Sequence, residues 1–145
     1  MSKRGELAIE RKHHGHNCAQ SIACTYADCV GADEELLYMI NQGFGGGLGG
    51  MEGHCGCLSG ASVILSLKGE SKTKTAGEMK RITGEFKERN SSVICKDLKG
   101  LKTGKMLRSC DDCVRDVCEF IEEYQMCIRD RLCITTTSRL ASPHH

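Results

Sequence analysis

A run of glycines leads directly into a cysteine-containing segment near the middle of the chain. The run Gly43-Phe-Gly-Gly-Gly-Leu-Gly-Gly50 comes shortly before Cys55-Gly-Cys-Leu-Ser-Gly60. Glycine adopts positive φ at no steric cost, so the run predicts a tight, irregular loop. The mostly small or apolar stretch over 55–67 predicts a buried helix. A thiol at a helix N-terminus has a lowered pKa because unpaired N–H groups and the helix dipole stabilise its thiolate. The segment therefore predicts a reactive Cys55.

Helical periodicity extends to the segments on either side of this helix. Cys18, Ile22, Thr25 and Cys29 follow the spacing i, i+4, i+7, i+11, which predicts a helix over 17–30. Asp33 is expected to cap a second helix that ends at Gly43. Gly56, Gly60 and Ala61 in the central helix are small enough for another helix, or a ligand, to approach its backbone closely.

Two further helices are expected in the second half of the chain. Thr75-Ala-Gly-Glu78 matches a capping box and is expected to open a helix, and Ser109 is expected to cap another that runs to about Tyr124. Cys95-Lys-Asp-Leu98 is expected in a short connector. No stretch of four or more residues alternates as a strand does. The sequence predicts an all-α, compact bundle of about five helices, formed by a single domain over 1–125, with the glycine-rich loop before the central helix.

The last twenty residues differ in kind from the rest. The segment that contains Cys127 and Cys133 continues no helical stripe and carries no cap. We expect residues 126–145 to be a tail that is non-native or disordered.

Charge and composition exclude several classes of partner. The net charge is +1, from 20 basic and 19 acidic residues, and there are only three Phe, three Tyr and no Trp. A chain with neither a basic excess nor aromatic stacking platforms is not expected to bind nucleic acid. No apolar run approaches the roughly 20 residues needed to span a bilayer, so membrane insertion is not expected.

The eleven cysteines are the main chemical signal in the sequence. Their number is odd, and the N-terminal residues 1–12 are charged throughout, without the apolar region of a secretory signal. These features favour a cytoplasmic protein, in which clustered cysteines more often bind metal or exchange electrons than cross-link a fold. No Ser/His/Asp set or paired-carboxylate pattern stands out, so the sequence leaves open whether the protein is an enzyme.

Several short motifs have competing interpretations. Cys110-Asp-Asp-Cys113 is a Cys-x-x-Cys motif that suits redox exchange or two metal ligands. However, thioredoxin-like motifs belong to βαβ surroundings, and a zinc ribbon needs a second such pair. Cys57 is as consistent with a small buried residue as with a functional one. His16 and His54 lie near Cys18 and Cys55, which permits a mixed Cys/His metal site, although a surface histidine run is the commoner explanation.

Five segments follow one another in a distinctive order: His16-Asn-Cys-Ala-Gln20, Gly43-Phe-Gly-Gly-Gly47, Cys55-Gly-Cys-Leu-Ser-Gly60, Cys95-Lys-Asp-Leu98, and Cys110 with Val114-Arg-Asp116. This order resembles the C-GCAxxG-C-C family of small redox-active proteins. By this resemblance, which covers about residues 15–125, the signature cysteines are Cys18, Cys55, Cys95 and Cys110. The chain departs from the family pattern at Cys57, where the family has Ala, and at Cys113, where an apolar residue is usual.

Two hypotheses follow for these four cysteines. In the first, Cys18, Cys55, Cys95 and Cys110 converge beside the glycine loop as a thiol-redox or electron-transfer site. Cys55 is then the most acidic thiol, and the partner is another protein or a small molecule. In the second, the same cysteines hold an iron–sulfur cluster or zinc, since four thiolates are the usual complement for either. The roles of Cys24, Cys29 and Cys118 are left open.

Overall fold

The computed structural model describes residues 2–69 and 71–123, and within them all regular structure is helical apart from one isolated bridge between His54 and Ile94. The predicted all-α class is therefore confirmed. The expected tail lies outside the described residues. In chain order the elements are α1 (Lys3–His13), α2 (Cys18–Thr25), the 3-10 turn η1 (Ala27–Val30), α3 (Glu34–Ile40), the π turn η2 (Gly47–Met51), α4 (Gly56–Lys68), α5 (Lys72–Asn90), α6 (Cys95–Lys99) and α7 (Cys110–Glu123).

The described elements outnumber the five helices that were expected. α1 was missed because only Gly5, Ala8 and Ile9 are buried in an otherwise charged segment. The segment is still a helix, because Ser2 caps it by accepting a hydrogen bond from the N–H of Gly5 at 2.8 Å. The predicted connector at Cys95 is the single-turn helix α6.

Three predicted helix boundaries were wrong. The helix expected to end at Gly43 ends at Ile40. The helix predicted over 17–30 ends at Thr25, after which the chain tightens into η1. The helix predicted to open at Thr75 begins at Lys72, because Ser71 accepts a hydrogen bond from the N–H of Lys74 at 3.1 Å and so acts as its cap. These errors do not affect the core, since Ile22 of α2, Leu37 of α3, and Ile82 and Phe86 of α5 are buried.

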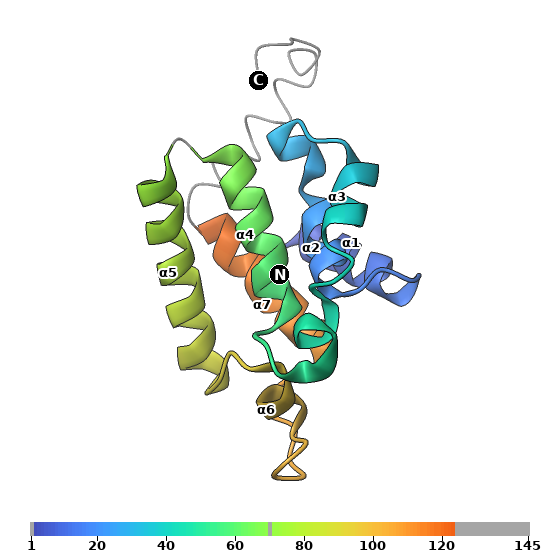
Figure 1. Ribbon diagram of the computed structural model, residues 1–145, viewed down its shortest axis with the longest axis vertical. Coiled ribbons are helices and arrows are strands. Elements are labelled where there is room, and N and C mark those ends of the chain that lie inside the picture. The colour runs from blue at the N-terminus through green and yellow to red at the C-terminus, as the bar shows by residue number, and fades with distance from the viewer. Residues whose placement is uncertain (1, 70, 124–145) are drawn as a thin grey trace.

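α4 occupies the centre of the fold, with α2, α5 and α7 packed around it (Figure 1). Its contact with α2 depends on glycine. A Cβ at Gly60 would lie 2.6 Å from the carbonyl oxygen of Ala19 and 3.0 Å from the Cβ of Ile22. Real Cβ atoms do not come this close to a backbone oxygen, so only glycine allows the two helices to approach this far. This confirms the prediction that small residues of α4 admit a neighbouring helix.

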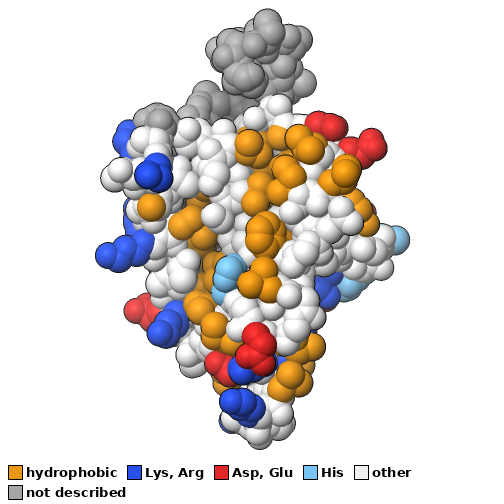
Figure 2. Space-filling model, viewed as in Figure 1, with side chains coloured by type: hydrophobic (Ala, Val, Ile, Leu, Met, Phe, Trp, Pro, Cys, Tyr) orange, Lys and Arg blue, Asp and Glu red, His pale blue; other side chains and the backbone are white. Residues whose placement is uncertain are grey.

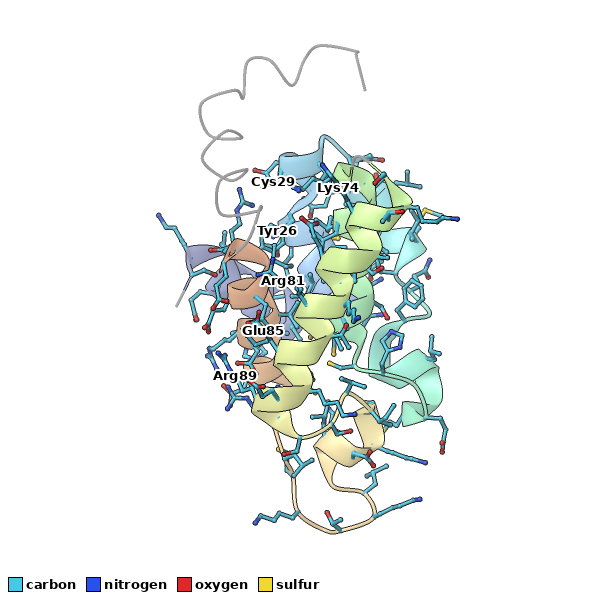
Figure 3. The ribbon with its side chains drawn as sticks, turned by 90° about the vertical axis from the view of Figure 1, so that its left-hand side faces the viewer. Tyr26, Cys29, Lys74, Arg81, Glu85 and Arg89 are labelled. Carbon is cyan, nitrogen blue, oxygen red and sulfur yellow. The ribbon has the colours of Figure 1, made fainter. Side chains whose placement is uncertain are left out.

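A buried carboxylate connects α5 to α7. Asp116 is 1% exposed and accepts hydrogen bonds from Arg89, Arg108 and Asn90 at 2.9–3.1 Å. Arg89 lies at the end of α5, further along the helix from Arg81 and Glu85 (Figure 3). Burial raises the pKa of Asp116, but these hydrogen bonds outweigh burial and the pKa is lowered overall. The network therefore keeps Asp116 ionised and fixes α7 against α5.

The surface carries an apolar face over α3 and the glycine-rich segment (Figure 2). Its large exposed side chains are Leu36, Tyr38, Met39, Ile40 and Leu48. Apolar surface of this kind is typical of a binding face. Within the described residues, no helix combines the length and the apolar character that crossing a membrane requires.

Candidate functional site

Four helices begin at a cysteine, and these are the four cysteines singled out by the sequence. Cys18, Cys95 and Cys110 are the first residues of α2, α6 and α7, and Cys55 immediately precedes α4. The starts of α2, α4 and α7 lie on the side of the helix bundle that faces α6 (Figure 1). A helix N-terminus carries unpaired N–H groups and the positive end of the dipole, which taken alone stabilise a thiolate.

The position of Cys18 is set by the residue before it. Asn17 forms a capping box with Gln20, in which each side chain accepts a hydrogen bond from the other residue's backbone N–H, at 2.8 and 2.9 Å. The amide of Asn17 also donates to the carbonyl oxygens of Asn41 and Gln42, both at 3.1 Å. The start of α2 is thereby tied to the chain that enters the glycine-rich segment.

The glycine-rich segment folds back over Cys95. The N–H of Cys95 donates to the carbonyl of Gly53 at 2.9 Å, and the N–H of Cys55 donates to the carbonyl of Val93 at 2.7 Å. Gly47 has a φ of +60°, and a Cβ there would lie 2.5 Å from the Cβ of Cys95. Both the conformation and the close approach require glycine at this position. The loop therefore places Cys95 and Cys55 on two neighbouring stretches of backbone that are joined by hydrogen bonds.

Five thiols form a series in which each side chain shifts the pKa of the next, and we call this series the thiol string. Cys110 interacts with Cys18, Cys18 with Cys57, Cys57 with Cys55, and Cys55 with Cys113. The string thus begins and ends on α7 and passes through the starts of α2 and α4. Cys95 interacts with Cys55 and Cys18 through charge but makes no hydrogen bond within the string. The nine cysteines among the described residues carry no disulfide.

The string divides into thiols that accept hydrogen bonds and thiols that donate them. Hydrogen bonds from Cys110 and Cys57 lower the pKa of Cys18, and hydrogen bonds from Cys113 and Cys57 lower the pKa of Cys55. The pKa values of the three donors are raised because each loses its bond on deprotonation and because burial disfavours its charge. Thiolate character is therefore concentrated on Cys18 and Cys55.

One end of the string is more accessible and lies next to positive charge. Cys18 and Cys110 are half-buried, whereas Cys55, Cys57 and Cys113 are buried. The ammonium group of Lys99 hydrogen-bonds to the sulfur of Cys110. The charges of Lys12 and Lys99 lower the pKa of Cys18 further. We call Cys18 and Cys110 the outer pair, and Cys55 and Cys113 the inner pair.

The other cysteines among the described residues lie apart from the string. Burial raises the pKa of Cys24 to about 11 and that of Cys118 to about 12, so both are protonated thiols at neutral pH. Cys29 lies in η1, at the far end of α2 from Cys18 (Figure 3). Cys127 and Cys133 fall outside the described residues. His54 bonds to the hydroxyl of Ser59 at 2.6 Å, and no hydrogen bond joins it to a cysteine among the described residues.

Sequence reasoning gave too little weight to Cys57 and Cys113. Cys57 was considered as consistent with a small buried residue as with a functional one. Cys113 was given less weight than Cys110 because the family pattern has an apolar residue at its position. One signal could have identified Cys113: it lies one helical turn after Cys110, so both must face the same side of α7. Cys57 carries no such signal, because its sulfur reaches Cys18 only through the close packing of α2 on α4.

The comparisons with known proteins agree with the pattern of cysteines. No curated protein and no solved structure matches this chain. The family described as "Putative redox-active protein (C_GCAxxG_C_C)" matches residues 16–124, which include every cysteine of the thiol string and Cys95. The chain therefore belongs to the C_GCAxxG_C_C family.

Proposed function

We propose that this protein exchanges thiols and disulfides with a partner through the outer pair, and that the thiol string carries the oxidation to the inner pair. The observation that supports this is the string itself, in which each thiol shifts the pKa of the next. The starts of α2 and α4 are packed together, since a Cβ at Gly56 would lie 3.3 Å from the Cβ of Cys18. Disulfide exchange between such thiols requires Cα atoms within about 7 Å of each other. The family's redox character is consistent with this chemistry.

The outer pair supplies both groups that the exchange needs. The Cys18 thiolate attacks a partner disulfide, forms a mixed disulfide and expels one partner sulfur as a thiolate. The thiol of Cys110 passes its proton to that thiolate and attacks the sulfur of Cys18, which releases the second partner sulfur. A disulfide between Cys18 and Cys110 results. The partner disulfide gains two electrons, and the outer pair loses two.

Cys57 connects the outer pair to the inner pair. It is fully buried and bonds to both Cys18 and Cys55, but it carries one proton and can donate to only one of them at a time. Attack by Cys57 on Cys18 releases Cys110, attack by Cys55 on Cys57 releases Cys18, and attack by Cys113 on Cys55 releases Cys57. Each exchange replaces one disulfide by another, so no further oxidant is required. The inner pair then stores the disulfide away from solvent.

Cys95 has a different position from the other three signature cysteines. It lies under Gly47 and next to Lys99, and burial raises its pKa. We propose that it remains a thiol during exchange and that its contact with the glycine-rich segment fixes the backbone beside Cys55. Cys113 takes the place of Cys95 in the proposed chemistry.

The distances favour disulfide chemistry over a single zinc ion at these cysteines. Zinc–sulfur bonds of about 2.3 Å place the sulfurs of a tetrahedral site about 3.8 Å apart. Within the part of the chain that the structure describes, the one set of three candidate ligands within 4.8 Å of one another is His16, Cys24 and Glu34, which are not in the string. Iron and sulfide analysis of anaerobically purified protein tests the remaining alternative, an iron–sulfur cluster held by the same cysteines.

Exchange with glutathione disulfide tests the proposal. We expect the reduced protein to release two glutathione molecules for each glutathione disulfide that it consumes, at a rate set by Cys18. Cys18→Ser abolishes the reaction, the double variant Cys110→Ser/Cys57→Ala stops it at a mixed disulfide that mass spectrometry detects, and Cys29→Ser is the matched control with the wild-type rate. Release of two glutathione molecules by Cys18→Ser at the wild-type rate would contradict the proposal.

A further inference from the structure

A second cluster of candidate ligands lies between α2 and α3, outside the thiol string. One ring nitrogen of His16, the sulfur of Cys24 and a carboxylate oxygen of Glu34 all lie within 4.8 Å of one another. His16 precedes α2, Cys24 lies in the last turn of α2, and Glu34 begins α3. Three segments therefore bring a nitrogen, a sulfur and an oxygen ligand to one point.

The surroundings hold these side chains in place. The ring of His16 packs edge-on against the ring of Tyr38, with centroids 5.0 Å apart. The sulfur of Cys24 contacts the backbone carbonyl oxygen of Glu34 at 3.7 Å. The Nδ1 atom of His16 is buried and has no hydrogen-bond partner among the described residues. A buried ring nitrogen without a partner is costly to desolvate, and coordination of a metal ion is one way to satisfy a ring nitrogen.

The cluster opens onto a pocket with room for further ligands. The pocket has a volume of about 420 Å³ and is lined by His16, Cys24, Asp33, Glu34, Glu35 and Tyr38. A water molecule takes up about 30 Å³ of liquid volume, so water has ample room to complete a coordination shell. The acidic side chains at the rim add negative charge next to the three ligands.

We propose that His16, Cys24 and Glu34 bind a zinc ion whose fourth position faces this pocket. Zinc takes imidazole nitrogen, thiolate sulfur and carboxylate oxygen in tetrahedral sites, and three protein ligands with one open position are typical of sites that bind water or substrate. Zinc–ligand bonds of about 2.0–2.3 Å place ligand atoms about 3.3–3.8 Å apart. Side-chain rotations that move the ligand atoms by about 1 Å bring atoms separated by 4.8 Å to these distances.

The positive charge of Arg11, which contacts Glu34, provides a way to test the site. Its guanidinium donates to a carboxylate oxygen of Glu34 at 2.9 Å and to the hydroxyl of Thr25 at 3.2 Å. The positive charge balances Glu34 when no metal is bound and opposes a cation at the same place. Replacing Arg11 with glutamine is therefore expected to tighten zinc binding, whereas a change at any of the three ligands weakens it.

Metal titration of the full reduced chain under anaerobic conditions tests the site. The probes are Zn²⁺, measured by elemental analysis after dialysis, and Co²⁺, whose thiolate charge-transfer absorption reports a sulfur ligand. We expect His16→Ala and Cys24→Ser to bind one metal ion fewer than wild type, and Glu34→Gln to bind that ion at least about tenfold more weakly. The matched controls His14→Ala, Cys29→Ser and Glu35→Gln keep the wild-type stoichiometry.

Two further experiments distinguish metal binding at this site from metal binding at the thiol string. Cys18→Ser is expected to keep the metal ion that His16→Ala loses, and His16→Ala is expected to keep the wild-type rate of exchange with glutathione disulfide. Because Cys24 is buried, circular dichroism checks that its variant is folded, and the half-buried His16 and exposed Glu34 give the same test without a core substitution. Wild-type metal content in both His16→Ala and Glu34→Gln, or loss of all bound metal in Cys18→Ser, would overturn the proposal.

Discussion

Replacing Gly60 with alanine should destabilise the fold by forcing α2 away from α4. The new Cβ would lie 2.6 Å from the carbonyl oxygen of Ala19 and 3.0 Å from the Cβ of Ile22. Carbon atoms prefer separations of about 3.5–4.0 Å, so the helices must separate by a substantial fraction of an ångström. Both opposing groups belong to the helix framework of α2 and cannot rotate away.

The expected magnitude is a difference between two terms. Overpacking of a core costs about 1–3 kcal/mol, and a clash with backbone belongs at the upper end of that range. Alanine gains about 1 kcal/mol over glycine in a helix interior. The net loss of unfolding free energy is therefore about 2 kcal/mol, which lowers the Tm by roughly 5–10 °C for a domain of this size.

The control is a glycine in a helix that faces open space. A Cβ at Gly84 in α5 would meet nothing within 4 Å, so Gly84→Ala should gain about 0.5–1 kcal/mol from helix propensity alone. Urea denaturation of the reduced protein, followed by circular dichroism, measures both variants. Equal or greater stability of Gly60→Ala than of wild type would refute the argument that glycine sets the distance between α2 and α4.

Three more predictions follow from the site and the buried network. Asp116→Asn should lower the free energy of unfolding by about 2 kcal/mol at pH 7. This is less than for a fully buried ion pair, because Arg89 and Arg108 are both about a third exposed. The pKa of Asp116 is lower in the folded protein than the value of about 3.9 in the unfolded chain, so its contribution to stability is present above about pH 3.9. This contribution is lost as the pH falls through the pKa of Asp116 in the folded protein. Urea denaturation should therefore give the same unfolding free energy for variant and wild type in acid. Lys99→Gln should move the pH dependence of Cys18 alkylation by iodoacetamide to higher pH, since it removes a charge that lowers the pKa of Cys18; an unchanged pH dependence, or an equal effect of Lys102→Gln, would count against this. Cys57→Ala should leave oxidation of the outer pair intact and prevent the disulfide from reaching the inner pair, as read by peptide mapping.

The sequence predicted the fold class and the helices whose apolar stripes are strong. α4 and α7 lie close to their expected positions because a continuous apolar stretch and a capped stripe leave few alternatives. α1 was missed because its buried face consists of only three residues, and it is stabilised by tertiary contacts such as the ion pair between Lys12 and Asp111 at 3.3 Å. The pattern of residues along a single segment does not reveal such tertiary contacts.

The candidate site shows the same division between local and long-range information. That Cys55 precedes a helix follows from neighbouring residues, and the structure places it there. That the sulfur of Cys18 contacts Cys57, and that His16 lies beside Cys24 and not beside Cys18, depends on how α2 packs against α4 and α3. The spacing of residues along a single helix cannot supply those contacts.

Disulfide mapping of the full chain during mild oxidation tests the central proposal most directly. The reduced, folded protein is exposed to a small excess of glutathione disulfide, quenched in acid at successive times, alkylated and digested, and its linked peptides are identified by mass spectrometry. The account predicts that the bond between Cys18 and Cys110 forms first and that the bond between Cys55 and Cys113 replaces it. A first disulfide between Cys110 and Cys113, or one that involves Cys24, Cys29 or Cys118, would contradict it.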